Sequence, residues 1–454
     1  MRLFIHKRNI QFIIYFIFSI SLYIFSPINY NWFFNLVCGI IFFLSTCALK
    51  VSQDEKNYFD FETIFLLSYF FCFFVYPIFI YVIDPEYFFM FSFDFDHDKI
   101  NKGTALALVG AESFILGSSI CYTKFNHNIQ SKENIINIPT KLIHSITVLL
   151  FIVFIMSGGY SSYKSLYNNG GTVSGIYSYI IILFVSVYIL SVSSEFVKAK
   201  KLVHSKNILP YKSLSKLFIL FILTSSLIFL SAGSRTVMLQ IMLSYLGLYS
   251  LFFFKINLKQ FVVISLIGAI LLTSITYTRA GNQVSIVSFW DLFMDLIINN
   301  RSTYFALSFT EENGYTCGVS MLGYILKCIP FSQKIVCNLF GIDEKTITSA
   351  MIVTRETLGD DPELGLGTNI IADIYLAFGF VGVLLFMYAL GYYSKKSYLY
   401  SIKGHIYYLF FYTSILSVAI YMVRSEYFYS LNLILWAFII YNVFKHYKKK
   451  TEFK

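Results

Sequence analysis

Residues 215–232, SKLFILFILTSSLIFLSA, and residues 237–254, VMLQIMLSYLGLYSLFFF, are two apolar runs separated only by GSRT at 233–236. Each run approaches the ~20 apolar residues that a helix needs to cross a hydrocarbon core of about 30 Å. Gly233 permits a sharp turn between the two helices, and Arg235 lies in that turn. The stretch therefore predicts a helical hairpin that crosses a membrane twice.

The composition of the whole chain agrees with such segments. Of the 454 residues, 57% are hydrophobic, 20% aromatic and only 13% charged, and the mean hydropathy is +0.66. These values are typical of a polytopic membrane protein and exclude an ordinary water-soluble domain. We predict an all-α membrane protein with about 12 transmembrane helices, at roughly 10–26, 31–48, 61–83, 103–122, 142–157, 174–193, 215–232, 237–254, 260–277, 369–391, 406–423 and 427–444.

Lysine-rich segments alternate with acidic or uncharged ones between these runs. Cytoplasmic loops hold the excess of Lys and Arg, so the alternation predicts that both termini are cytoplasmic. The net charge of +10 follows from these loops, and we expect no nucleic-acid partner.

The arginines are distributed differently from the lysines. Under this topology only six of 28 lysines, but five of seven arginines, lie on the outer side, and those five are Arg235, Arg279, Arg301, Arg355 and Arg424. The planar guanidinium matches carboxylate and phosphate oxygens through two hydrogen bonds, so the five residues predict an anionic ligand such as a lipid-linked phosphate. The alternative is that these side chains snorkel at helix ends or pair with nearby carboxylates.

One long polar interval divides the chain. Residues 278–368 separate a nine-span bundle, 1–277, from a three-span bundle, 369–454, which ends in a basic cytoplasmic tail. We expect the interval to form one large outer loop with amphipathic helices. The loop contains three cysteines, Cys317, Cys328 and Cys337. They can form at most one disulfide if the loop faces an oxidising compartment.

Within this loop, residues 284–299 have the pattern of an amphipathic helix. Asp291 and Asp295 are four apart and share one face of it, and Arg301 follows directly. Residues 319–340 form a second apolar region that a proline interrupts. A loop folded on itself as a cap, without a ligand, is the alternative interpretation.

The first helix after the loop contains a charge in an apolar run. Asp373 lies about one turn inside the span, where a charge is costly, so a functional or paired role is favoured over simple exposure. We include Asp373 and the nearby Tyr375 among the candidate substrate-binding residues. Gly379 and Gly382 are expected to permit close helix packing.

Several kinds of site have no sequence signal. No His/Cys/Asp spacing resembles a zinc site, and the chain contains neither a P-loop nor a dinucleotide-binding glycine pattern. We therefore expect no metal site and no cofactor.

Together these features resemble the Wzy-type O-antigen and enterobacterial common antigen polymerases, a family of oligosaccharide repeat unit polymerases of bacterial inner membranes. The layout of most of the chain is similar, and the specific motifs begin at about Ser231. They are Gly233-Ser234-Arg235, Arg279-Ala280-Gly281, Arg301, Gly367-Thr368 through Phe378-Gly379 with Gly382, and Arg424-Ser425-Glu426.

The resemblance implies a glycosyltransferase C-like helical fold and an activity at the periplasmic face of the inner membrane. Members of the family join oligosaccharide repeat units carried on undecaprenyl pyrophosphate and release that carrier, without using a nucleotide sugar. The resemblance further implies a Wzz-type chain-length regulator and a Wzx-type flippase as partners.

For this reaction the candidate residues fall into two groups. A leaving pyrophosphate needs fixed positive charge, which Arg235, Arg279, Arg301 and Arg424 would supply. The general base is expected to be a carboxylate, with Glu426 as one candidate and Asp291, Asp295, Glu356 and Asp373 as rivals. A purely structural role for Glu426 in holding Arg424 is an equal alternative. The candidate substrate-binding residues are Arg355, Asp291, Asp295, Asp373 and Tyr375.

Three other functions compete with this interpretation. A flippase for lipid-linked oligosaccharides also has many spans, but a large outer loop is unexpected in it. An O-antigen ligase is expected to have an important histidine in that loop, and residues 278–368 contain none. A non-catalytic membrane scaffold would not account for the outer arginines.

Overall fold

The computed structural model describes residues 7–53, 57–93, 95–125, 140–169, 175–206, 209–279, 289–362 and 364–452. Within these ranges the regular secondary structure is helical and contains no strand, which confirms the all-α prediction. Two residues of one predicted motif, Ala280 and Gly281, lie outside the described ranges, as do residues 284–288.

The first half of the chain forms α1 Lys7–Ile24, α2 Trp32–Ser52, α3 Phe61–Phe73, the π-helix η1 Tyr76–Ile80, η2 Phe89–Phe91, α4 Lys99–Phe125, α5 Thr140–Met156, α6 Gly159–Asn169, α7 Gly175–Lys206, α8 Pro210–Ser213, α9 Lys216–Ser231, α10 Arg235–Phe252 and α11 Leu258–Arg279. The second half forms η3 Phe289–Phe293, α12 Met294–Ile297, η4 Ile298–Asn300, α13 Arg301–Asn313, η5 Val319–Met321, α14 Leu322–Leu326, α15 Ser332–Phe340, η6 Glu344–Thr346, α16 Ser349–Leu358, α17 Ile370–Ile402, α18 Ile406–Ser417, α19 Ala419–Val423 and α20 Leu431–Glu452. Apart from η1, the η elements are 3-10 helices.

Each of the predicted apolar runs contains a helix. By length and composition, four helices among the described residues can cross a membrane by themselves, namely α2, α4, α7 and α17. The pair α5 and α6, bent by 59°, gives a fifth span if it is counted as one. The total of about 12 spans stays a prediction.

Among the described residues, α4 and α17 form the most extensive contact between two helices, and glycine residues let the two helices approach closely. A Cβ on Gly117 of α4 would lie 2.2 Å from the carbonyl oxygen of Tyr388, and one on Gly391 of α17 would lie 2.0 Å from that of Phe114. The two backbones are therefore in direct contact, as small residues allow in membrane helices.

The glycines predicted to serve this purpose behave differently. Gly379 has φ +63° and lies at a kink inside α17, and a Cβ on it would meet the Tyr315 ring at 2.6 Å. A Cβ on Gly382 would meet the side chain of Phe378 in its own helix at 2.5 Å. Gly379 thus provides a backbone conformation that only glycine adopts readily, together with space for a loop aromatic ring, rather than a contact between two helices.

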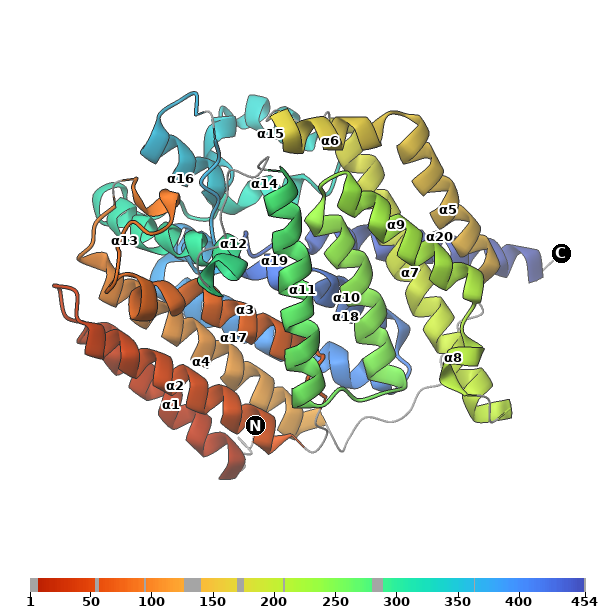
Figure 1. Cartoon of the computed structure of the whole chain (residues 1–454), viewed down its shortest axis with the longest axis horizontal. Coiled ribbons are helices and arrows are strands. Elements are labelled where there is room, and N and C mark those ends of the chain that lie inside the picture. Colours follow the sequence, from red (N-terminus) through yellow and green to blue (C-terminus); the bar gives the residue numbers. More distant parts are fainter. Residues whose placement is uncertain are drawn as a thin grey trace.

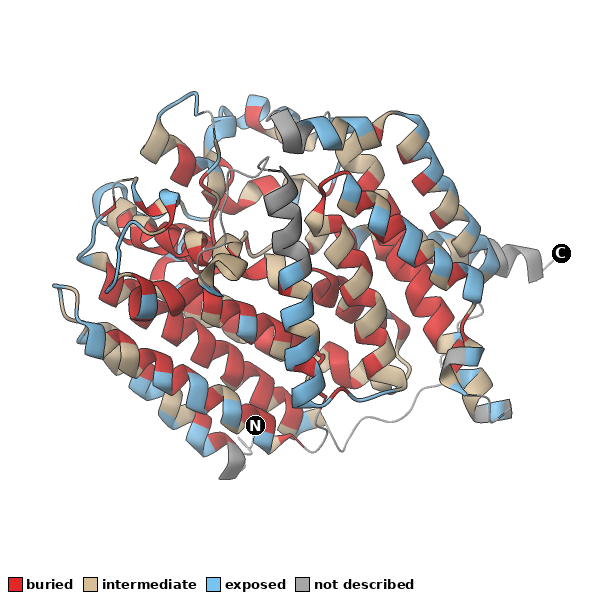
Figure 2. Cartoon of the chain, in the orientation of Figure 1, coloured by how far each residue is buried: buried red, intermediate tan, exposed pale blue. Residues whose placement is uncertain are grey.

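The outer helices expose apolar side chains. Leu217, Leu220 and Leu227 of α9 are exposed, as are Val263 and Ile270 of α11. Figure 2 shows exposed residues along the outward sides of α1, α2, α9 and α11, whereas α4, α17 and α3 are mostly buried. Exposed apolar area of this extent is expected where helices face lipid rather than water.

The polar interval folds at one end of the helical bundle, where Figure 1 places α12 to α16 in the upper part of the view. The predicted helix 284–299 is broken in its described part into η3, α12 and η4. In the second apolar region, α14 and α15 lie on either side of Pro330. The three cysteines of the interval are free thiols.

Candidate functional site

The turn that carries Arg235 has a defined backbone geometry. After α9, Gly233 adopts φ +89°, and its N–H bonds to the carbonyl of Leu230 at 2.9 Å. The Ser234 N–H bonds to the carbonyl of Phe229 at 2.8 Å. These two bonds form a Schellman motif, which ends α9 sharply and lets α10 begin at Arg235.

Arg424 lies in a second short turn, directly after α19. Its guanidinium carbon lies 5.4 Å from the centre of the Tyr421 ring. The turn is tied to α17, because the Asp373 carboxylate accepts a hydrogen bond of 2.9 Å from the Tyr427 N–H. Asp373 is fully buried. The hydrogen bond from Tyr427 thus ties Asp373 to the turn that carries Arg424, while a functional role for Asp373 stays a prediction.

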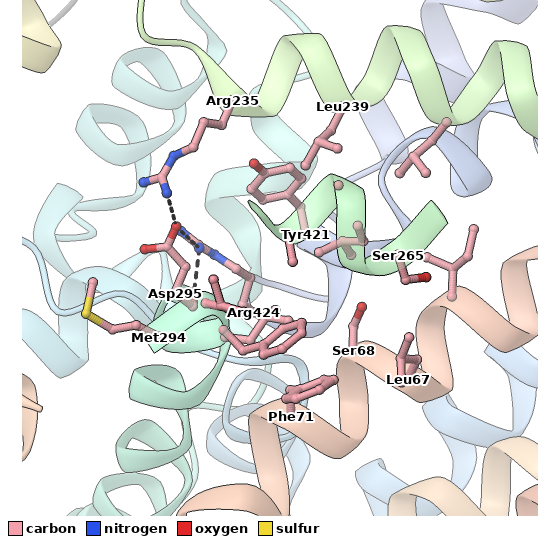
Figure 3. A pocket seen from close by; sticks show the side chains of 18 of the residues that line it. Leu67, Ser68, Phe71, Arg235, Leu239, Ser265, Met294, Asp295, Tyr421 and Arg424 are labelled. Carbon is pink, nitrogen blue, oxygen red and sulfur yellow. Dashed lines mark hydrogen bonds and ion pairs between the residues drawn. The ribbon is translucent and has the colours of Figure 1, made fainter. Parts of the chain in front are cut away.

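Asp295 of α12 joins the two arginines. Its carboxylate Oδ2 lies 2.5 Å from Nη1 of Arg235 and 3.6 Å from Nη1 of Arg424. The same Arg424 nitrogen donates a hydrogen bond of 3.0 Å to the Asp295 main-chain carbonyl. Figure 3 shows both guanidinium groups pointing toward this one carboxylate. The structure therefore brings together three of the predicted site residues.

These three side chains form the polar end of a cavity of about 660 Å³. Most of its remaining lining is apolar and comes from α3, α10 and α11, including Leu67, Phe71, Met238, Met242, Leu246, Phe261, Ile264 and Ile267, and the rest comes mainly from residues 87–89, 291–296 and α19. On α10 the lining extends from Arg235 to Leu246, about 16 Å at 1.5 Å per residue. The cavity has the shape and polarity for an amphiphile with an anionic head and an apolar tail.

Asp291 also lies at the polar end of the cavity, one turn before Asp295. The Tyr87 hydroxyl donates to its two carboxylate oxygens at 3.0 and 3.2 Å. Sequence reasoning missed Tyr87 because a tyrosine within an aromatic-rich segment gives no signal of this contact. Tyr421, which also lines the cavity, was missed for the same reason.

Two of the other predicted arginines, Arg301 and Arg355, do not line the cavity. Arg301 is buried at the start of α13, where it lies 3.5 Å from both the Phe93 carbonyl and the Thr357 hydroxyl. Arg355 on α16 pairs with Asp343 and Asp360, each at 2.8 Å. Both residues connect parts of the long polar interval to one another or to the loop before α4. The third, Arg279, ends α11, and its side chain lies outside the described part of the chain.

Glu426 and Tyr375 have buried surroundings of their own. The Tyr375 hydroxyl lies 3.5 Å from that of Tyr23. The Glu426 carboxylate accepts a hydrogen bond of 2.7 Å from Ser425 and a further one from Tyr324. Burial raises the pKa of Glu426 above its usual value, although these hydrogen bonds and the nearby Lys327 oppose the shift.

The amino-acid sequence matches one known family. The model of the family "O-antigen polysaccharide polymerase Wzy" matches residues 8–451, nearly the whole chain. No curated protein and no solved structure matches the chain. The family acts on lipid-linked oligosaccharides, which agrees with an apolar cavity that ends in two arginines. The chain therefore belongs to the O-antigen polysaccharide polymerase Wzy family and is a multi-pass membrane protein of polysaccharide biosynthesis.

Proposed function

We propose that the Arg235–Arg424 end of the cavity binds the pyrophosphate of an undecaprenyl-pyrophosphate-linked oligosaccharide. The observation that carries the proposal is the convergence of these two arginines, from separate turns, on the single carboxylate of Asp295. A carboxylate and a phosphate oxygen present the same charge and hydrogen-bonding geometry to a guanidinium. Asp295 therefore stands where phosphate oxygens would lie, and it must move aside when the substrate binds.

The apolar walls fit the lipid part of the same substrate. The part of a polyprenyl chain next to the pyrophosphate would lie along α10 between α3 and α11, whose side chains there are apolar. Burial of apolar surface contributes roughly 25 cal/mol per Å², so even a short length of chain adds substantially to binding.

In the proposed reaction the growing chain is transferred from its carrier to an incoming repeat unit. A hydroxyl oxygen of the acceptor's non-reducing-end sugar forms a new bond to the anomeric carbon of the donor's first sugar. The bond from that carbon to the pyrophosphate oxygen breaks, and its electron pair remains on undecaprenyl pyrophosphate. Arg235 and Arg424 stabilise this negative charge, and the proton of the acceptor hydroxyl passes to a carboxylate.

Glu426 is the carboxylate that we assign to this proton. It follows Arg424 by two residues, so the group that binds the leaving group and the group that takes the proton share one rigid turn. Its pKa is raised by burial, which makes it a better proton acceptor than an exposed glutamate once it is ionised.

The proposed topology places this site at the periplasmic face of the inner membrane. The lysine-rich segments adjoin the helix ends that lie away from the site. Because such segments are typical of cytoplasmic loops, both termini would be cytoplasmic. In this arrangement residues 278–368 form the periplasmic loop, and the enzyme receives lipid-linked units from a Wzx-type flippase and acts with a Wzz-type chain-length regulator.

Replacement of each arginine in the source strain tests the proposal. Arg235→Lys and Arg424→Lys retain the charge but lose the two-pronged geometry, so each should leave lipopolysaccharide with a single repeat unit or very short chains on a gel. Arg355→Lys is the matched control, because Arg355 pairs only with exposed carboxylates among the contacts described and should retain long chains. Normal chain length in both cavity variants would contradict the proposed site, and loss of every O-antigen form would point to a flippase or ligase function.

A further inference from the structure

We propose that a second, smaller hollow on the opposite side of the first turn of α10 binds the non-reducing-end sugar of the acceptor. The inference rests on the proposed function, because it names the second substrate site of the same reaction. The hollow has a volume of about 230 Å³, and its polar lining includes Ser234, Thr236, Gln240, Tyr324, Lys327 and Asn432.

The size and polarity of this hollow differ from those of the apolar cavity. Its volume is below the roughly 300–1,000 Å³ of pockets for drug-sized ligands, so it suits a single small ring. Hydroxyl, amide and ammonium groups come to it from several separate parts of the chain, namely α6, α7, the start of α10, α14 with Lys327, and α20. A sugar ring presents hydroxyl groups around its edge, and such a set of donors and acceptors can hydrogen-bond to several of them.

One buried polar atom in the lining makes no hydrogen bond. The Oγ of Ser234 has no hydrogen-bond partner within the described part of the protein, although the residue is 1% exposed. Leaving a buried hydroxyl without a hydrogen-bond partner is unfavourable, so such an atom indicates a ligand that completes its bonding. Ser234 immediately precedes α10, and the free N–H groups of the first turn of that helix favour an electron-rich oxygen nearby.

Lys327 and Tyr324 form the other side of the hollow. The Lys327 ammonium lies 5.3 Å from the centre of the Tyr324 ring, and that ring lies 5.8 Å from the Tyr429 ring. Burial lowers the pKa of Lys327, and the Glu426 carboxylate opposes this shift. The carboxylate that we assign as general base is therefore adjacent to residues that line the hollow.

Only a thin wall separates the hollow from the apolar cavity. Arg235 lines the cavity, whereas its neighbours Ser234 and Thr236 line the hollow. Tyr421 of the cavity and Thr236 of the hollow hydrogen-bond to each other and so form part of this wall. A sugar in the hollow would thus lie close to the place where the donor's pyrophosphate binds, with Glu426 on the hollow's side of the wall.

Binding measurements on the full-length protein in nanodiscs test this assignment without requiring turnover. The acceptor probe is the strain's own repeat unit converted to its methyl glycoside, which has the non-reducing end but neither lipid nor pyrophosphate. Undecaprenyl pyrophosphate is the probe for the cavity. Gln240→Leu and Lys327→Met should each weaken binding of the methyl glycoside by about tenfold and leave the affinity for undecaprenyl pyrophosphate unchanged.

Two control variants have the same types of substitution at positions outside the hollow. Gln260→Leu on α11 and Lys334→Met on α15 should change neither affinity, and thermal unfolding of all four variants checks that they are folded. If both hollow variants bind the methyl glycoside as the wild type does, or if the wild type does not bind it, the assignment of the hollow is overturned. Failure of the proposed function gives a different result, namely unchanged binding of undecaprenyl pyrophosphate by Arg235→Lys and Arg424→Lys.

Discussion

One guanidinium nitrogen of Arg424, Nη1, contacts Asp295 twice. It lies 3.0 Å from the Asp295 main-chain carbonyl oxygen and 3.6 Å from the Asp295 carboxylate. The carbonyl contact does not depend on the Asp295 side chain. In the proposed site, substrate phosphate replaces the carboxylate while Arg424 stays hydrogen-bonded to the main chain of α12. The main-chain carbonyl of Asp295 thus positions Arg424, whereas the carboxylate of Asp295 occupies the proposed anion site.

Removal of the Asp295 charge should strengthen phosphate binding. Asp295→Asn eliminates the internal anion that competes for Arg235 and Arg424, and a charged hydrogen bond is worth roughly 1.5–3 kcal/mol. We expect the affinity for undecaprenyl pyrophosphate, measured in nanodiscs, to rise about tenfold. The control is Asp343→Asn, which removes the carboxylate of a solvent-exposed ion pair with Arg355 of α16. Weaker binding by Asp295→Asn would mean that the carboxylate orients the arginines instead of competing with the ligand.

The pH dependence of polymerisation should report Glu426. A general base works only when it is deprotonated, and the pKa of Glu426 is raised above the ordinary value of 4.5. Activity should therefore fall, as the pH is lowered, at a higher pH than an exposed glutamate would give. The Lys327 ammonium lowers this pKa, so Lys327→Met should move the acid limb to still higher pH.

Glu426→Gln is the complementary test of the same residue. It should remove the acid limb and lower kcat by roughly 10²–10⁴-fold, the usual contribution of general acid–base catalysis. An unchanged acid limb in Glu426→Gln would assign the proton transfer to another carboxylate, and Asp295 would then be the first to examine.

The α4–α17 contact should be intolerant of a single methyl group. Gly117→Ala and Gly391→Ala each place a Cβ within 2.2 Å of a main-chain oxygen on the other helix, so the helices must separate. Overpacking of this kind typically costs about 1–3 kcal/mol, which thermal unfolding in detergent will show as a lower Tm. Gly175→Ala at the start of α7 is the control, because nothing lies within 4 Å of its Cβ position. Equal Tm values for all three variants would argue against the close approach of α4 and α17.

A buried ion pair connects α3 to α17 at the end of α3 away from Arg235 and Arg424. The Lys395 ammonium lies 2.9 Å from the Glu62 carboxylate, and the side chains are 2% and 4% exposed. Lys395→Met leaves a buried carboxylate with less compensation, which should destabilise the protein by about 3–5 kcal/mol. The double variant Glu62→Gln, Lys395→Met should recover much of this loss. Additive effects of the two substitutions would show that the pair does not act as a unit.

Local sequence patterns predicted much of the fold and part of the site. The apolar runs and the Gly233 turn are properties of adjacent residues, so the helices and the position of Arg235 followed from them. Arg424 was identified for the same reason, because it occupies a short turn between two apolar runs. The cost of a charge in an apolar helix drew attention to Asp373, which accepts a hydrogen bond from the Tyr427 N–H in the structure.

The pairing of these residues in space was not predictable. Arg235 and Arg301 were both predicted to bind the leaving pyrophosphate, but of these two only Arg235 pairs with Asp295, because that contact depends on how α10 and α12 pack in three dimensions. The α4–α17 contact through Gly117 and Gly391 was missed for a similar reason. A glycine in an apolar run gives no indication of which helix it faces.

The most direct test of the account is transfer by the purified enzyme from a defined undecaprenyl-pyrophosphate-linked repeat unit. Arg235→Lys and Arg424→Lys should each lower kcat/KM for this donor by roughly 10²–10³-fold, as expected for loss of a fixed group that stabilises a leaving anion. Arg355→Lys should remain within about twofold of the wild type, because exposed ion pairs contribute little. Wild-type kcat/KM in both cavity variants would contradict the claim that Arg235 and Arg424 bind the pyrophosphate.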